Sequence, residues 1–255
     1  MELPLQGKKG LVVGIANDQS IAYGCAQAFR EAGADLAVTY LNDKGRPYTE
    51  PLSEALGAEL FLPCDVREDG QVEALFEAVA DRWGKLDFLL HSIAFAPRED
   101  LHGRVTDCSR EGFDMAMNVS CHSFIRMARH AEPLMRDGGA LMTMSYYGAE
   151  KVVDRYNLMG PVKAALEASV RYLAVELGRQ NIRVYAVSPG PLKTRAASGI
   201  DRFDELMDQA AARAPNHALV TIEQVGSVAA FLASGAAAGM TGNVVYVDNG
   251  YNVVG

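Results

Sequence analysis

The sequence predicts an α/β fold with a doubly wound parallel sheet, organised as a single domain over residues 1–255. Short apolar runs of strand length alternate with longer stretches of helical periodicity, an order typical of parallel sheets covered by helices. With 49% hydrophobic and 22% charged residues, the chain has enough apolar side chains for one large core. Its length would also allow two domains, but no linker, repeat or low-complexity segment divides it.

The first elements form a strand, a helix and a second strand. We expect a buried strand at residues 10–14, a helix at 20–32 that ends at Gly33, and a strand at 36–40. Further strands are expected at 60–62, 88–91, 140–144, 183–187 and 244–247, with helices such as 71–83 and 164–177 between them. The ligand crevice of such a Rossmann-like sheet lies beyond the carboxyl ends of its strands.

Charge and cysteine content argue against several classes of protein. A formal net charge of −8 disfavours non-specific binding to nucleic acid or to anionic membrane. The four cysteines are widely spaced, which indicates reduced, neutral thiols rather than a disulfide frame or a zinc site. No signal peptide is recognisable, and no apolar run approaches the ~20 residues that span a bilayer. We therefore expect a cytoplasmic protein without a metal and without membrane insertion.

The turn after the first strand is a candidate nucleotide site. Gly14 allows a tight turn, and Ser20 and Ile21 at the helix start offer hydroxyl and amide groups to a pyrophosphate. The match to G-x-G-x-x-G is poor, so a simple packing turn is an equal alternative. Asp65 follows the third strand, where its carboxylate could accept from an adenine amino group or could cap a helix. Small residues after the fourth strand suit a close approach to a ribose and nicotinamide.

Tyr156 and Lys163 lie seven residues apart. On a continuous helix seven steps turn through about 700°, so both side chains would share one face. A cation beside a phenol favours its ionised or strongly hydrogen-bonding form, and an ammonium can hold ribose hydroxyls, which suits carbonyl chemistry beside a nicotinamide. A solvated helix face is the alternative.

The end of the second strand bears on the choice of cofactor. Leu41 and Asn42 are neutral and Asp43 would repel a 2′-phosphate, so we expect NADH/NAD rather than NADPH. Lys44 and Arg46 lie near enough in the sequence to keep NADPH as an alternative.

Several motifs together resemble the short-chain dehydrogenase/reductase superfamily, and within it the NADH-dependent bacterial enoyl-(acyl-carrier-protein) reductases. The matching segments run over nearly the whole chain; they are residues 20–24, 64–66, 91–97, 145–150, 156–160 and 190–200. Commoner members of the superfamily place lysine four residues after tyrosine, where this chain has Gly160. The seven-residue interval is typical of the enoyl reductases.

The resemblance implies reduction of the trans-2 double bond of an enoyl thioester by hydride transfer from NADH during fatty acid elongation. Tyr156 would then stabilise the enolate by a hydrogen bond, and Lys163 would hold the nicotinamide ribose. Tyr146 would be a second catalytic tyrosine in the same site, with a role as pocket wall as its alternative.

The same resemblance implies the contacts of cofactor and substrate. The expected cofactor contacts are Gly14, Ser20, Ile21, Asp65, Val66, Ile93, Lys163, Leu192, Lys193, Thr194, Arg195 and Ala196. The expected substrate contacts are Ala96, Tyr146, Met159, Ala196, Ile200 and Phe203. For the last four, which would form the apolar acyl pocket, core packing is the alternative. His91 is expected to be structural. The family analogy also implies a homotetramer.

Residues 192–215 are predicted to form a helical substrate-binding lid, with a plain connecting helix as an equal alternative on spacing alone. The acyl group would be carried on acyl carrier protein or on coenzyme A. Acidic residues replace the basic ones that related lids often have; they are Asp201, Asp204 and Glu205. An acidic carrier would be attracted less, which leaves a specialised enoyl reductase of a secondary pathway open. Two competing hypotheses are a reductase of a ketone or alcohol and a non-catalytic nucleotide-binding protein.

Overall fold

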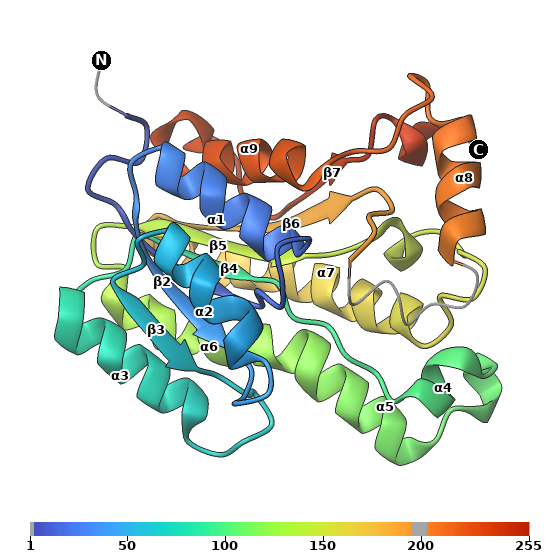
Figure 1. Ribbon diagram of the computed structural model, residues 1–255, viewed down its shortest axis with the longest axis horizontal. Coiled ribbons are helices and arrows are strands. Elements are labelled where there is room, and N and C mark those ends of the chain that lie inside the picture. The colour runs from blue at the N-terminus through green and yellow to red at the C-terminus, as the bar shows by residue number, and fades with distance from the viewer. Residues whose placement is uncertain (1–2, 195–202, 255) are drawn as a thin grey trace.

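A parallel sheet forms the centre of the protein in the computed structural model, which describes residues 3–194 and 203–254 (Figure 1). In these residues seven strands lie in the order β3-β2-β1-β4-β5-β6-β7, and every neighbouring pair is parallel. The strands are β1 (Lys9–Val13), β2 (Asp35–Tyr40), β3 (Leu60–Pro63), β4 (Phe88–His91), β5 (Gly139–Met144), β6 (Ile182–Pro189) and β7 (Asn243–Val247). The predicted doubly wound parallel sheet is confirmed.

Helices cover both faces of the sheet (Figure 1). The longer ones are α1 (Ile21–Glu31), α2 (Arg46–Ala55), α3 (Gln71–Trp83), α5 (Arg110–Met117), α6 (Ser123–Ala131), α7 (Met159–Leu177), α8 (Phe203–Arg213) and α9 (Ile222–Ala233), and α4 (Arg98–His102) is a short one. One face carries α1, α2 and α9, and the other carries α3, α6 and α7. A π-helical turn, η2 (Asn118–His122), joins α5 to α6.

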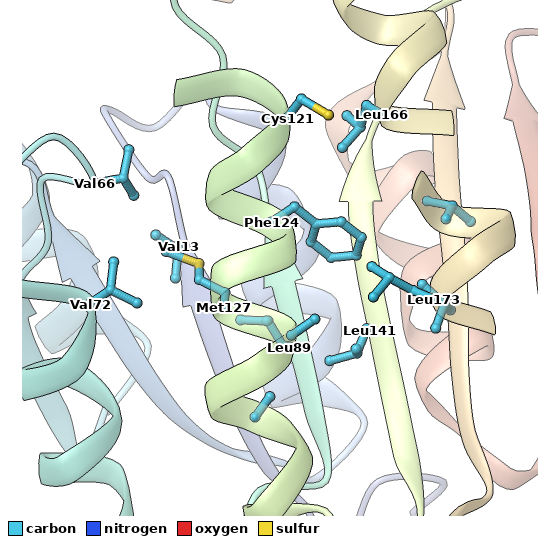
Figure 2. Close-up of a cluster of buried hydrophobic side chains, with 14 of the residues drawn as sticks. Val13, Val66, Val72, Leu89, Cys121, Phe124, Met127, Leu141, Leu166 and Leu173 are labelled. Carbon is cyan, nitrogen blue, oxygen red and sulfur yellow. The ribbon is translucent and has the colours of Figure 1, made fainter. Parts of the chain in front are cut away.

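Alternate strand residues supply two hydrophobic cores. In β1, Leu11 and Val13 face the core that contains Phe124 of α6, whereas Val12 faces the core under α1 and α9. Figure 2 shows the first of these cores, in which Phe124 and Met127 lie between α6 and the sheet. Because successive side chains of a strand point to opposite faces, a strand buried on both faces is apolar throughout. Burying each large side chain contributes roughly 1.5–3 kcal/mol.

Two helices approach each other closely through a pair of glycines. A Cβ atom on Gly24 of α1 would lie 2.5 Å from the carbonyl oxygen of Ile222, and one on Gly226 of α9 would lie 2.3 Å from the carbonyl oxygen of Gly24. Both distances are too short for a carbon–oxygen contact. The lack of side chains therefore allows α9 to pack on α1, the helix that begins beside the predicted nucleotide turn.

The predicted element boundaries agree with the structure to within two residues, except at one long helix. The predicted helix 71–83 is found with the same bounds, between Gly70 and Gly84, which both adopt left-handed backbone. The helix expected at 164–177 begins earlier, at Met159. Pro161 lies in its first turn, where a missing amide hydrogen costs little because that hydrogen would have no partner within the helix. A proline here marks a helix start, which moves the first turn of α7 towards Tyr156.

Candidate active site

The sheet reverses its strand order between β1 and β4, and Gly14 lies at the carboxyl end of β1 at this point. Its backbone φ is +112°, and a Cβ atom there would lie 2.1 Å from the carbonyl oxygen of Ser92. The amide of Ser92 in turn donates to the carbonyl of Val13 at 2.9 Å. Only glycine fits this turn, so a ligand can approach the backbone at the switch point closely.

Ser20 holds the loop between Gly14 and α1. Its Oγ accepts hydrogen bonds from the amides of Ala16 and Asn17, both at 3.0 Å, and donates to Asn17 Oδ1 at 3.1 Å. The Ser20 side chain makes no capping bond to α1. The first-turn amides of α1, from Ile21 onwards, are therefore not capped by this hydroxyl and suit an anionic ligand.

Asp65 follows β3 and is paired with a residue that the sequence did not single out. Arg67 donates to its carboxylate from Nε at 2.9 Å and from Nη2 at 2.6 Å. This guanidinium lowers the pKa of the Asp65 carboxyl. It also lies over the ring of Phe95, 5.8 Å from the ring centroid. The predicted adenine contact of Asp65 therefore requires the carboxylate to be shared with Arg67 or released by it.

Tyr156 lies in the turn before α7 and not on a continuous helix with Lys163, so the helical geometry expected for the pair is wrong. Arg155 and Asn157, on either side of the tyrosine, have φ values of +63° and +41°, which no α-helix accommodates. The Asn157 side chain donates to the carbonyl of Leu101 at 2.8 Å and fixes this turn. Tertiary contacts, rather than helical periodicity, therefore place the phenol.

The phenols of Tyr156 and Tyr146 lie together. Their rings meet edge to face, with centroids 4.8 Å apart and an interplanar angle of 62°. Burial raises the pKa of both hydroxyls. Of the two forms that the sequence left open for Tyr156, the neutral hydrogen-bond donor is therefore the one favoured here. The hydroxyl of Tyr146 is buried and has no hydrogen-bond partner among the described residues.

Lys163 is buried in α7, with 4% of its surface exposed. Its Nζ donates to the carbonyl of Met144 at 2.6 Å, which holds the ammonium at the carboxyl end of β5. Burial lowers the pKa of Lys163 to about 8, and the nearby Cys121 and Glu167 oppose this shift. The ammonium and both phenols thus belong to one edge of the sheet, where Tyr146 follows β5 by two residues.

Two buried polar groups support this edge. Ser145 donates from Oγ to Glu167 Oε1 at 2.5 Å, a contact that the sequence did not reveal because the residues lie 22 positions apart. His91 pairs through Nδ1 with Thr143 Oγ1 at 2.9 Å and through Nε2 with Ser123 Oγ at 2.8 Å. Burial lowers the pKa of His91 to about 3. The prediction that His91 is structural is confirmed.

Residues 14–252 match the family model described as enoyl-(acyl carrier protein) reductase. The chain belongs to this enoyl reductase family. Among its relatives, the NADH-dependent enoyl-(acyl-carrier-protein) reductase 1 of Rhizobium meliloti is 47% identical, over 98% of this chain and 92% of that protein. The corresponding NADH-dependent protein of Synechocystis is 48% identical, over 99% of both chains.

Solved structures of enoyl reductases superpose closely on this family member. The Anaplasma phagocytophilum reductase in complex with NAD has a TM-score of 0.96 at 47% identity, over 100% of this chain and 97% of the other. The Bacillus cereus reductase, solved with NADP+ and indole naphthyridinone, also has a TM-score of 0.96, at 44% identity and 100% coverage of both chains.

Several residues predicted to contact substrate in this enoyl reductase lie in the apolar core or outside the described part. Ala96 and Met159 are buried and pack in the same core as Tyr156. The predicted residues Arg195, Ala196 and Ile200 lie outside the described residues, and Phe203 is described only as the first residue of α8. The acyl pocket and the lid function of residues 192–215 stay predictions.

The remaining cofactor residues expected for an enoyl reductase follow three strands, β3, β4 and β6. Ile93 follows β4; its partly buried side chain packs against the hydrophobic core that contains Tyr156. Leu192 follows β6 and packs on the opposite core, and its carbonyl accepts from the amide of Thr194 at 2.8 Å. Val66 lies shortly after β3, and its carbonyl accepts from the Arg126 guanidinium at 2.9 Å. Lys193, between Leu192 and Thr194, is exposed.

The four cysteines are free thiols, and burial raises the pKa of each. These raised pKa values agree with the prediction of neutral thiols in this enoyl reductase. Within the described ranges, no cluster of histidine, cysteine and acidic residues could hold a metal ion. No helix in that part of the chain is both long and apolar enough to cross a membrane.

Proposed function

We propose that this protein reduces the trans-2 double bond of an enoyl thioester with NADH, as a step of fatty acid elongation. The observation that carries the proposal is the pair of neutral, buried phenols, Tyr146 and Tyr156, at the same sheet edge as the ammonium of Lys163. Membership of the enoyl reductase family supports it independently.

The residues at the sheet edge fit a nicotinamide dinucleotide. A Cβ atom on residue 14 would fill the space at this turn. The first turn of α1, which the Ser20 side chain does not cap, follows the turn. The buried Tyr146 hydroxyl can donate a hydrogen bond but has no partner among the described residues, so it is available to a ligand. We assign Gly14, Ser20 and Ile21 to the phosphates, Asp65 and Val66 to the adenine, and Ile93, Lys163 and residues 192–196 to the nicotinamide half.

The chemistry needs a donor where negative charge develops. When bound, NADH supplies the hydride for the β-carbon of the conjugated thioester. The neutral hydroxyl of Tyr156 would donate to the thioester oxygen, and a preorganised donor of this kind is typically worth ~3–4 kcal/mol of barrier. The ammonium of Lys163 would hold the ribose hydroxyls and add positive potential beside that oxygen. Tyr146 packs against Tyr156 and, with Met159 and Ala96, would border the acyl group.

The end of β2 supports NADH over NADPH. Arg46 follows this strand tip closely, and its guanidinium lies 5.5 Å from the Tyr40 ring centroid. Its Nη2 pairs with Glu50 at 2.7 Å. A 2′-phosphate would have to compete with this carboxylate for the guanidinium. The reductase relatives named for NADH agree with this preference.

The carrier, assembly and location complete the proposal. We assign the thioester to acyl carrier protein because the family is described by that carrier, and coenzyme A thioesters are the competing substrates in the test. A homotetramer is proposed on the family resemblance alone, and a cytoplasmic location is the expectation from the sequence.

The test compares substrates with one preparation of the protein. We expect NADH oxidation with crotonyl thioesters on acyl carrier protein and little with acetoacetyl thioesters on the same carrier. The reverse preference would identify a ketone reductase. Tight NADH binding without turnover of any enoyl thioester would identify a non-catalytic nucleotide-binding protein. Repeating the assay with coenzyme A thioesters of graded length defines the carrier and the acyl chain.

A further inference from the structure

A buried carboxylate lies one helical turn beyond the catalytic lysine. Glu167 is four residues after Lys163 in α7 and has 8% of its surface exposed. Residues four apart are neighbours on one helix face. The end of β5 contacts both side chains, because the carbonyl of Met144 accepts from Lys163 and the hydroxyl of Ser145 donates to Glu167. Consecutive residues of one strand end therefore hold the cation and the carboxylate.

Among the titratable groups near Lys163, Glu167 is the one whose negative charge can balance the ammonium. The groups that influence Lys163 in the described structure are Cys121, His91 and Glu167. Burial raises the pKa of Cys121, and the pKa of His91 is lowered to about 3, so both are neutral near pH 7. Glu167 is the remaining group that can carry a negative charge.

Opposing effects act on the Glu167 carboxyl. Burial is the largest of them and raises the pKa of Glu167 above its ordinary value, as does Glu150 to a lesser extent, whereas the hydrogen bond from Ser145 and the positive charges of Arg171 and Lys163 limit the rise by stabilising the carboxylate. The other neighbours are phenols, Tyr156 and Tyr246, whose own pKa values are raised. The two side chains bond to separate partners, the Met144 carbonyl and the Ser145 hydroxyl, so Glu167 acts on the ammonium through its charge and not through a direct contact. Burying opposite charges contributes little net stability, because the cost of desolvation offsets the attraction. A buried carboxylate kept beside the predicted site therefore indicates a role in the reaction.

We infer that Glu167, held by Ser145, is a positioning residue that keeps the buried Lys163 ammonium charged and able to donate to the ribose of the dinucleotide. This inference rests on the proposed function, since it acts through the role assigned there to Lys163.

The consequence is a defined pH dependence. Lys163 is charged below its pKa of about 8 and loses its proton above that value. Loss of the Glu167 charge removes a stabilisation of the ammonium, so the pKa of Lys163 falls further. Binding of NADH, which needs the ammonium, then weakens at a lower pH. A nearby opposite charge typically shifts the pKa of an ionisable group by about one unit or more.

The test measures NADH affinity by fluorescence from about pH 6 to about pH 10, a range that brackets the titration of Lys163. In the unchanged protein we expect the affinity to fall above about pH 8. In Glu167→Gln the fall should begin about one unit lower. Glu167→Asp, which keeps the charge, should recover most of the difference. Ser145→Ala, which frees the carboxylate, should give a smaller shift of the same sign.

Glu150→Gln is the matched control. Glu150 is an exposed carboxylate that accepts from Tyr246 at 2.8 Å and lies near Glu167, but it is not among the groups that influence Lys163. We expect its affinity profile to superpose on that of the unchanged protein. Lys163→Met should abolish the alkaline fall, because the titrating group is gone.

The inference is overturned if folded Glu167→Gln keeps the original profile, if Glu150→Gln shifts as far, or if the fall persists in Lys163→Met. Should Glu167→Gln fail to fold, Ser145→Ala and Glu167→Asp decide by the same readout. These outcomes concern NADH binding alone. Failure of the proposed function would show separately, as absence of enoyl thioester turnover in the unchanged protein.

Discussion

Tyr156 and Tyr146 meet edge to face, 4.8 Å between ring centroids, although they come from different local structures. Tyr146 follows strand β5, and Tyr156 lies in an irregular turn before α7. The ring of Tyr156 also packs on Gly148, where a Cβ atom would lie 2.4 Å from Tyr156 Cδ1. The two phenols therefore form one packed unit, in which the Tyr146 hydroxyl is buried without a hydrogen-bond partner among the described residues.

Removing the Tyr146 hydroxyl should separate stability from activity. A buried polar group without a partner costs free energy, so we expect Tyr146→Phe to leave the free energy of unfolding unchanged or raise it by about 1 kcal/mol. Turnover of enoyl thioester should fall, because the hydroxyl is available only to a ligand. Chemical denaturation and steady-state kinetics on the same sample measure both quantities.

Tyr185→Phe is the control for this substitution. The Tyr185 hydroxyl donates to the carbonyl of Met240 at 2.6 Å, and the Tyr185 side chain packs in the core on the opposite face of the sheet from Tyr156. Loss of the Tyr185 hydroxyl should lower the free energy of unfolding by about 1–2 kcal/mol with turnover retained. A loss of stability in Tyr146→Phe comparable to that in Tyr185→Phe would contradict the assignment.

Gly14→Ala should damage both the fold and NADH binding. The added Cβ would lie 2.1 Å from the Ser92 carbonyl oxygen, so the turn must move. Gly70→Ala is a matched control, because Gly70 also has a positive φ, +81°, but has open space around it. We expect about 1 kcal/mol lost in Gly70→Ala with normal NADH affinity, and a larger loss with at least tenfold weaker binding in Gly14→Ala. Calorimetric titration with NADH would show equal affinities if the turn is not a nucleotide site.

Glu50→Gln should relax the preference for NADH. Freed from its carboxylate partner, the Arg46 guanidinium becomes available to a 2′-phosphate. We expect kcat/KM with NADPH to rise by up to about fivefold while that with NADH stays unchanged, since an exposed ion pair contributes at most about 1 kcal/mol. Glu54→Gln, on the same helix, is the control. An unchanged ratio in Glu50→Gln would show that Arg46 does not face the ribose.

His91 should make the fold sensitive to acid. Its folded pKa of about 3 lies below the ordinary value of 6.5, so the unfolded state binds the proton first as the pH falls. The stability associated with neutral His91 is complete above pH 6.5 and is lost progressively as the pH falls towards the folded pKa. Between pH 6.5 and about pH 4 the loss should reach up to about 3 kcal/mol.

Denaturation of His91→Gln should show a flatter dependence on pH in this interval, because the titrating ring is gone. His122→Gln changes an exposed histidine on η2 and should keep the slope of the unchanged protein. Parallel curves for the unchanged protein and His91→Gln would contradict the assignment of this slope to His91.

Local signals made most of the fold predictable. Strands buried on both faces appear as continuous apolar runs, and the glycines at 70 and 84 mark both ends of α3. The start of α7 was harder to predict, because a proline such as Pro161 breaks a helix interior although the first turn tolerates it. Near the end of the chain, Asn249 adopts a φ of +56° and donates to the carbonyl of Ala218 at 2.9 Å, a structural role that no local sequence pattern indicates.

The site was predictable only in part, because several of its contacts join residues that are distant or not in a recognisable motif. The pairing of Ser145 with Glu167 depends on how α7 docks on β5, which no local pattern describes. Arg67 lies close to Asp65 in sequence, but its ion pair depends on the turn after β3. Tyr156 and Lys163 were found from their interval, yet the helical geometry assumed for them does not occur.

The most direct test of the account is the rate of NADH oxidation with enoyl thioester in Tyr156→Phe, with Tyr147→Phe as the neighbouring control. The ring of Tyr147 contacts that of Tyr251, with centroids 5.5 Å apart, and takes no part in the ring contact between Tyr146 and Tyr156. We predict that kcat falls by about 100-fold to 1,000-fold in Tyr156→Phe, the loss typical for a transition-state donor, with NADH affinity retained. Turnover in Tyr156→Phe equal to that of the unchanged protein would contradict the claim that this phenol stabilises the developing negative charge.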